Sequence, residues 1–162
     1  MDKLWAPWRS KYVTRVNSIK GCIFCSKPKA GNDEANYIIS RGKSSLSMLN
    51  IFPYSNGHVM VAPYRHVKDM IGLSAAELFE IFDLTRKMQS LLVKTMKPDG
   101  FNIGINVGRA AGAGVKDHIH IHIVPRWVGD VNFMPVFTST KVISESLDAL
   151  YDRLTKCLRG KK

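Results

Sequence analysis

Residues 118–124 read His-Ile-His-Ile-His-Ile-Val, so three of the five histidines stand at every second position with isoleucines between them. A period of two is the period of a β-strand, in which successive side chains point to opposite faces. The three histidines therefore share one face and the isoleucines the other. The isoleucine face needs a hydrophobic core, whereas imidazoles buried without partners are costly. We expect the histidine face to meet a metal, other polar groups or a ligand.

Further strands and two helices are predicted from apolar periodicity and turn signals. The strands are expected at residues 37–39, 46–49, 58–62 (ended by Pro63) and 101–107, and Pro125 is expected to end or edge the histidine strand. Within 101–107 the apolar side chains share one face: Phe101, Ile103, Ile105 and Val107.

A long helix is predicted to begin at a capping box formed by Ser74 and Glu77 and to end near Met96. The residues expected on its core face are Leu78, Ile81, Phe82, Thr85, Met88 and Leu92. A last amphipathic helix is predicted between Ile143 and Leu158. Strands around one long helix, without regular strand–helix alternation, indicate an α+β fold with a mainly antiparallel sheet and a C-terminal helix.

The length of 162 residues fits a single domain. We divide it into an aromatic and basic N-terminal arm (1–20), a core with the candidate catalytic histidines (21–127) and a C-terminal extension with a helix (128–162). The formal net charge of +11 favours phosphate-bearing partners. The charges are not interleaved with aromatics, so no dedicated nucleic-acid surface is expected. No membrane span or signal peptide is recognisable, which favours the cytoplasm.

The histidine face has three interpretations: exposed histidines, a catalytic metal site, or a nucleophile that attacks phosphorus. Strict alternation makes the first improbable. Residues 108–114 hold three glycines and three alanines directly before the strand, and such a loop lets backbone N–H groups approach an anion. A plain hairpin turn is the alternative reading of this loop. Its position beside the histidines favours phosphate chemistry.

The three cysteines do not form a disulfide framework. Cys22 and Cys25 make a Cys-x-x-Cys pair that suggests metal binding or redox chemistry, with two plain buried cysteines as the alternative. Cys157 is expected to be a small buried apolar residue.

The motif His118–Val124 resembles the signature of the histidine triad (HIT) nucleotide hydrolases and transferases. Asn50, Pro53 and Gly57–Pro63 look like the nucleotide-binding strand of that family, and residues 106–108 and 112–114 look like its phosphate loop. The resemblance covers residues 22–127. Motifs outside the triad are similar to the branch with diadenosine tetraphosphate (Ap4A) phosphorylases and related hydrolases: Leu4–Arg9, Pro125–Trp127, Gly129-Asp130 and Phe133–Val136.

The resemblance implies a HIT-like fold, no organic cofactor, and chemistry at the α-phosphorus of a nucleotide. His120 would be the nucleophile, His122 would donate to the phosphate or the leaving group, and His118 completes the triad. The residues that would bind the substrate are Asn50 (ribose), His58 (supporting the triad), Asn106 (phosphate or leaving portion) and the loop amides of Gly112, Ala113, Gly114 and Val115. The segment from Gly114 to Asp117 departs from the Gln- or Ser-bearing segment of smaller members, so leaving-group contacts there are not carried over.

Relatives with this cysteine pair hold zinc on both cysteines, on a histidine after the proline and on the first triad histidine. This implies a structural zinc on Cys22, Cys25, His66 and His118. The family also forms two-fold dimers, which implies a homodimer. Trp5, Trp8 and Trp127 are candidates for such an interface, and packing within the chain is the alternative.

Three functions compete. The first is a HIT enzyme that cleaves dinucleoside polyphosphates by hydrolysis or, with inorganic phosphate, by phosphorolysis. The second is a metallohydrolase with all three histidines on one catalytic metal, which is weakened because Asp117 is the only carboxylate close in sequence. The third is a purine nucleotide-binding, phosphoramidate-hydrolysing protein that acts as an interaction module. The intact middle histidine favours the first.

Overall fold

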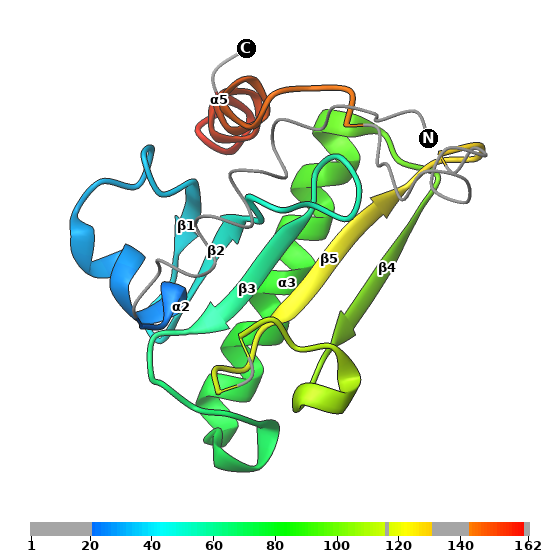
Figure 1. Cartoon of the computed structure of the whole chain (residues 1–162). Helices are drawn as coiled ribbons and strands as arrows, with labels where there is room; N and C mark the ends of the chain where they lie inside the picture. Colours follow the sequence, from blue (N-terminus) through cyan, green and yellow to red (C-terminus); the bar gives the residue numbers. More distant parts are fainter. Residues whose placement is uncertain (1–20, 116, 131–142, 161–162) are drawn as a thin grey trace, which may run out of the picture.

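The computed structural model describes residues 21–115, 117–130 and 143–160 (Figure 1). The N-terminal arm with Trp5 and Trp8, Lys116 and Phe133–Val136 lie outside these residues. The strands are β1 (Ile38–Arg41), β2 (Ser45–Leu49), β3 (Val59–Pro63), β4 (Gly100–Ile105) and β5 (Ile121–Arg126). The helices are α2 (Ile23–Ser26), α3 (Ala75–Met96) and α5 (Leu147–Leu158), with 3-10 turns η1 (Lys27–Ala30), η2 (Met70–Gly72) and η3 (Arg109–Ala111).

The five strands form one sheet in the order β1-β2-β3-β5-β4, and every neighbouring pair is antiparallel. Figure 1 shows α3 running behind the sheet and α5 lying across one end of it. The main core lies between α3 and the sheet, and α5 closes it with Leu150, Tyr151 and Leu154. The predicted α+β fold with a mainly antiparallel sheet, one long helix and a C-terminal helix is confirmed.

Helix α3 begins with the predicted capping box, in which Ser74 Oγ accepts from Glu77 N and a Glu77 carboxylate oxygen accepts from Ser74 N. It ends at Met96, as expected. The core face differs from the prediction at three positions: Phe82 is 48% exposed, whereas Leu84 and Leu91 are buried. Each residue turns the helix by about 100°, so Phe82 points well away from its buried neighbour Ile81.

The histidine strand is shifted relative to the prediction. β5 begins at Ile121, because Ile119 N bonds the carbonyl of Val67 in a loop instead of pairing with β3. Pro125 lies inside β5 and does not end it, so of the two expected positions the structure agrees with the edge position. The ladder with β3 stops at Ile123, so among the described strands Pro125 has a neighbour on one side only, which suits a residue without an N–H.

The core-facing side of the edge strand β4 is only partly buried. Phe101 and Ile105 pack against the core, whereas Ile103 on the same face is 44% exposed. Val107 lies beyond the end of the strand and is also exposed. None of the helices in the described segments is long and apolar enough to cross a bilayer.

Candidate active site

The two faces of the histidine segment separate as expected. Ile121 and Ile123 join the core under α3, and Ile119 packs with Val67 and Leu73. The histidines lie on the opposite face and are all buried. The rings of His120 and His122 are adjacent, with centroids 4.7 Å apart. Each imidazole has a polar partner, so the burial cost is offset.

His120 is fixed by a backbone carbonyl. Its Nδ1 lies 2.8 Å from the oxygen of His118, which accepts only, so Nδ1 must carry the proton. Nε2 of the neutral ring then holds a free electron pair. Burial lowers the pKa of the His120 imidazole below its ordinary value, which favours the neutral ring near pH 7. This is the protonation state of a nitrogen nucleophile.

His122 is oriented by His58 through a chain of three groups. The backbone N–H of Tyr54 donates to His58 Nδ1 at 3.1 Å, so the proton of neutral His58 is on Nε2. That Nε2 donates to His122 Nδ1 at 2.9 Å. Nδ1 of His122 is therefore an acceptor, and the proton of neutral His122 is on Nε2. Burial, reinforced by His120, lowers the pKa of His122 to about 4.

The loop between β2 and β3 brings Asn50 to His58. Asn50 Nδ2 lies 3.3 Å from His58 Nδ1, and Asn50 Oδ1 accepts from Phe52 N at 2.9 Å. The ring of Tyr54 lies beside both His58 and His122, with centroids 4.6 and 5.6 Å away. Sequence reasoning missed Tyr54. Its only signal is its place in the turn that leads into His58.

Phe24 is a second residue that was missed. It is fully buried, and its ring lies 5.1 Å from His118 and 4.8 Å from His120, centroid to centroid. Phe24 stands between Cys22 and Cys25, so the cysteine pair brings an apolar wall to the histidines. The large apolar residue inside Cys-x-x-Cys was the available signal.

The glycine-rich loop runs directly into the histidine segment. Gly108 and Gly112 adopt φ values of 79° and 81°, a region that favours glycine. Gly112 and Gly114 are exposed and Ala113 is half-buried. Val115 packs against the buried cluster that holds Phe24, and its carbonyl accepts from His118 N. Asn106 is half-buried just beyond the end of β4, the strand next to β5.

Four side chains form a candidate metal centre. Cys22, Cys25, His66 and His118 place one ligand atom each within 4.8 Å of one another. Nδ1 of His118 lies 3.1 Å from Cys22 Sγ, and Nδ1 of His66 lies 3.3 Å from Cys25 Sγ. Tetrahedral zinc ligands stand about 3.5 Å apart, so the set fits. Nε2 of His118 donates to the Pro63 carbonyl at 2.9 Å, which leaves Nδ1 unprotonated for a metal.

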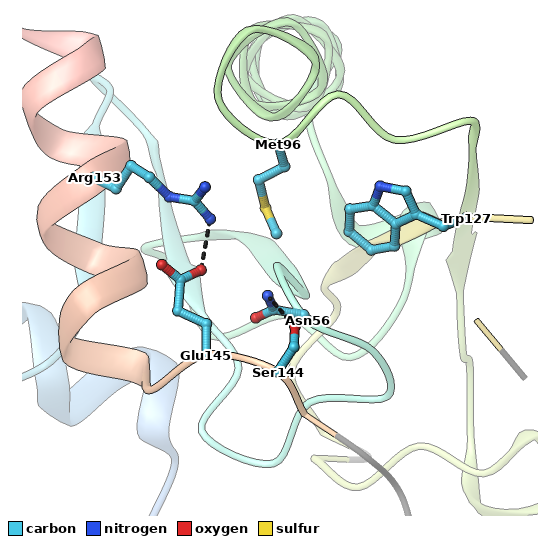
Figure 2. A pocket seen from close by; sticks show the side chains of 6 residues that line it. All are labelled: Asn56, Met96, Trp127, Ser144, Glu145 and Arg153. Carbon is cyan, nitrogen blue, oxygen red and sulfur yellow. Dashed lines mark hydrogen bonds and ion pairs between the residues drawn. The ribbon is translucent and has the colours of Figure 1, made fainter. Parts of the chain in front are cut away.

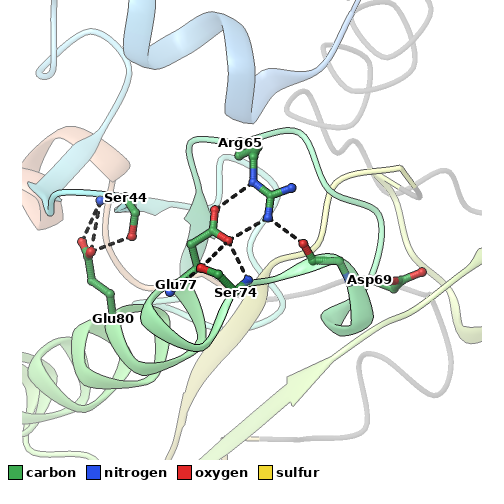
Figure 3. Close-up of polar contacts among 7 residues, drawn as sticks. Ser44, Arg65, Asp69, Ser74, Glu77 and Glu80 are labelled. Atoms are coloured by element: carbon green, nitrogen blue, oxygen red, sulfur yellow. Dashed lines mark hydrogen bonds and ion pairs between the residues drawn. The ribbon is translucent and has the colours of Figure 1, made fainter.

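The loop that carries His66 is tied to the start of α3 (Figure 3). Arg65 donates to both carboxylate oxygens of Glu77 at 2.9 and 2.7 Å and to the Gly72 carbonyl. Glu77 also caps α3, so one carboxylate fixes both the helix and the loop. The Arg65 guanidinium lowers the pKa of Glu77 to about 2.

A cavity of about 380 Å³ lies at the far end of β5, between the end of α3 and the start of α5 (Figure 2). Trp127 and Met96 form apolar walls of this cavity. Asn56 donates to Ser144 Oγ at 3.2 Å, and Arg153 pairs with Glu145. Asn56 belongs to the loop that holds Asn50 and Tyr54. Its hydrogen bond to Ser144 therefore connects the segment before α5 to the loop of the candidate site.

Comparison with known proteins agrees with this geometry. A family model described as "HIT domain" matches residues 32–128. An AP-4-A phosphorylase of Mycobacterium tuberculosis is 34% identical over 155 residues, which cover 91% of this chain and 79% of that protein. A bis(5'-nucleosyl)-tetraphosphatase (asymmetrical) of Schizosaccharomyces pombe is 38% identical over 93 residues, 57% of this chain and 50% of that protein.

Two solved structures share the fold. A hypothetical histidine triad nucleotide-binding protein from Sulfolobus tokodaii has a TM-score of 0.67 at 28% identity and covers 86% of this chain and 91% of its own. A zinc-bound histidine triad family protein from Mycobacterium smegmatis has a TM-score of 0.69 at 24% identity, with 86% and 94% covered. The expected HIT-like fold is confirmed.

Proposed function

The chain belongs to the HIT domain family, and we propose that it is an enzyme that cleaves dinucleoside polyphosphates through a nucleotidyl-histidine intermediate. The observation that carries the mechanism is the pair of fixed tautomers. His120 presents an unprotonated Nε2 because its Nδ1 donates to the His118 carbonyl. His122 carries its proton on Nε2 because its Nδ1 accepts from His58.

In the first step Nε2 of His120 attacks the α-phosphorus. A nitrogen–phosphorus bond forms, and the bond from phosphorus to the bridging oxygen breaks with its electron pair on the leaving nucleoside polyphosphate. Nε2–H of His122 donates to the phosphate or to that leaving oxygen. Backbone amides of the loop from Gly112 to Val115 stabilise the charge that develops on the phosphate, and Asn50 and Asn106 hold the ribose and the phosphate chain.

In the second step an acceptor oxygen attacks phosphorus and releases His120. Water as the acceptor gives hydrolysis, and inorganic phosphate gives phosphorolysis. Both activities occur in the names of the relatives, a phosphorylase and a tetraphosphatase. Splitting one displacement into two lowers each barrier, because the imidazole is a better nucleophile than water and a good leaving group.

A turnover assay tests this proposal. Diadenosine tetraphosphate is supplied with and without inorganic phosphate, and the nucleotide products are separated. We expect turnover by wild type and a loss of about a thousandfold or more in His120→Ala and His120→Asn, with nucleotide binding retained. Formation of ADP only when phosphate is present would identify a phosphorylase. Normal turnover by His120→Ala would rule out the histidine intermediate, and AMP binding without turnover by wild type would identify a binding module.

We also propose that the four-residue centre holds a structural zinc. Zinc would neutralise the two thiolates and tie the cysteine knuckle to the histidine segment. Burial raises the pKa of the Cys22 thiol, and a bound cation offsets that effect. His118 would then link the metal to the nucleophile, because its Nδ1 faces the cysteines and its carbonyl accepts from His120.

We further propose a homodimer formed at the edge of the sheet. Phe79 and Phe82 on α3 are 77% and 48% exposed, and Val93, about three turns after Phe82, is 47% exposed. These three residues form an exposed apolar strip along α3. Leu78, one turn before Phe82, packs on the same cluster as Ile105 of β4. The exposed strip of α3 therefore runs beside exposed Ile103 and the edge of β4 that has no partner strand among the described residues. Pairing two such edges would cover both.

A further inference from the structure

His122 stands in a row of residues that crosses the sheet. The register pairs Ile38 with Met48, Met48 with Met60, Met60 with His122 and His122 with Gly104. Residues that oppose one another directly point to the same face, with Cβ atoms about 5 Å apart. On one side of His122 the row is filled by Met60, Met48 and Ile38, all buried. On the other side stands a glycine.

The space above Gly104 is open. No atom in the described segments lies within 4 Å of the position that a Cβ at Gly104 would take, and the residue is exposed. Its φ is not in the positive region, so the backbone does not require glycine there. Glycine inside a strand costs stability and often marks a place where another molecule approaches. The missing side chain therefore leaves room beside the imidazole of His122.

The flanks of this space are polar. Asn102 stands two residues before Gly104 in β4 and shares its face, and Asn106 follows just beyond the end of the strand. The amide of Asn102 accepts from Arg126 at 2.7 Å, so a guanidinium lies at the far end of the strand. Ile103 and Ile105 point to the opposite face. We call this open face of β4 the trough: it lies over Gly104 beside His122 and is flanked by the amide of Asn102 and by Arg126, whose guanidinium also pairs with Asp130.

We infer, on the basis of the proposed function, that the trough over Gly104 receives the leaving nucleoside polyphosphate and that Gly104 determines specificity for an extended leaving group. The bond that breaks joins the α-phosphorus to the bridging oxygen, and the departing chain begins at that oxygen. A departing oxygen that receives a proton from His122 lies beside His122. The atoms attached to this oxygen need space next to the His122 ring. Within the row that crosses the sheet, such space lies only over Gly104, because Met60 fills the other side of His122.

The proposal is tested by enlarging the side chain at position 104. Gly104→Val places a β-branched side chain, which suits a strand, in the trough. Gly100→Val is the matched control: Gly100 is also in β4, has no described atom within 4 Å of its Cβ position, and lies opposite Arg126, about 13 Å along the strand from Gly104. Two substrates are compared: diadenosine tetraphosphate, which expels ATP, and adenosine 5'-phosphoramidate, which expels ammonia.

We expect Gly104→Val to lower kcat/KM for diadenosine tetraphosphate by about tenfold or more, and for the phosphoramidate by less than about twofold. Gly100→Val should leave both values unchanged. Gly104→Ala should give a smaller loss in the same direction, and it serves as the second variant if Gly104→Val unfolds in a thermal scan. An equal loss on both substrates, or no loss on the tetraphosphate with either variant, would overturn the role of Gly104. Failure of wild type to turn over either substrate would instead overturn the proposed function.

Discussion

At the scale of the residue, the protonation states of the site are set by the backbone. The carbonyls of Pro63 and His118 accept from His118 and His120, and the N–H of Tyr54 donates to His58. Backbone groups cannot change their protonation near pH 7, so each of these rings is held in one tautomer. His122 alone depends on another side chain, because its Nδ1 accepts from His58 Nε2.

Because His122 is buried, the free energy of unfolding should fall in acid. Its pKa is about 4 in the folded chain and about 6.5 when unfolded, so only the unfolded chain binds a proton between these values. The free energy of unfolding should fall by about 3 kcal/mol on this account as the pH drops from 6.5 to 4. Urea unfolding of wild type and of His122→Asn across this range measures the difference. If the free energy of unfolding depended on pH in the same way in wild type and in His122→Asn, the contribution of His122 would be contradicted.

Ser47 and Ser45 make a matched pair on one face of β2. The hydroxyl of Ser47 is buried without a hydrogen-bond partner among the described residues, whereas that of Ser45 donates to Glu80 at 3.1 Å. Ser47→Ala should raise the free energy of unfolding by about 1 kcal/mol, and Ser45→Ala should lower it by about as much. Chemical denaturation measures both changes. An equal loss in both variants would mean that Ser47 has a partner after all.

At this scale the sequence predicted that the histidines share one face, but not how they are protonated or which aromatic residues lie beside them. The alternation of residues 118–124 was enough to put the histidines on one face, because that pattern is local. The tautomer of His58 depends on Tyr54 N, and the burial of Phe24 against His120 depends on chain folding across nearly a hundred residues. Neither relation leaves a periodic trace in the sequence.

At the scale of the element, the cysteine knuckle joins two distant parts of the chain. α2 brings Cys22 and Cys25, and the loop after β3 brings His66, to the start of the histidine segment. One zinc per chain is expected. Its removal by a chelator should lower stability by about 4 kcal/mol, the value for a ligand at a thousand times its Kd. Metal analysis and thermal unfolding measure this.

Variants give the control for the metal site. Cys25→Ser and His66→Ala should lose zinc, whereas Cys157→Ser, which changes the cysteine outside the cluster, should keep it. Cobalt substitution should leave kcat close to that of the zinc form, because the proposed role of the metal is structural. A change of kcat that follows the metal would instead favour the metallohydrolase. Full zinc content in His66→Ala would remove that residue from the ligand set.

The elements themselves were predicted where the signal is local and missed where tertiary contacts decide. The capping box at Ser74 and Glu77 and the break after Met96 located α3 correctly. The exposure of Phe82 could not be read from the helical spacing, since the sequence does not say where the sheet ends. The same holds for Pro125, which is tolerated inside β5 only because β3 stops short of it.

At the scale of the whole molecule, the exposed strip of α3 and the edge of β4 predict a dimer that one charge should break. Phe82→Glu places a carboxylate in the proposed contact and should weaken the dimer about thirtyfold or more, which corresponds to about 2 kcal/mol. Leu158→Glu, on an equally exposed apolar residue of α5, is the control and should not change it. Sedimentation velocity over a range of concentrations measures both. A wild type that stays monomeric at high concentration, or dimers of equal affinity in Phe82→Glu and wild type, would exclude this interface.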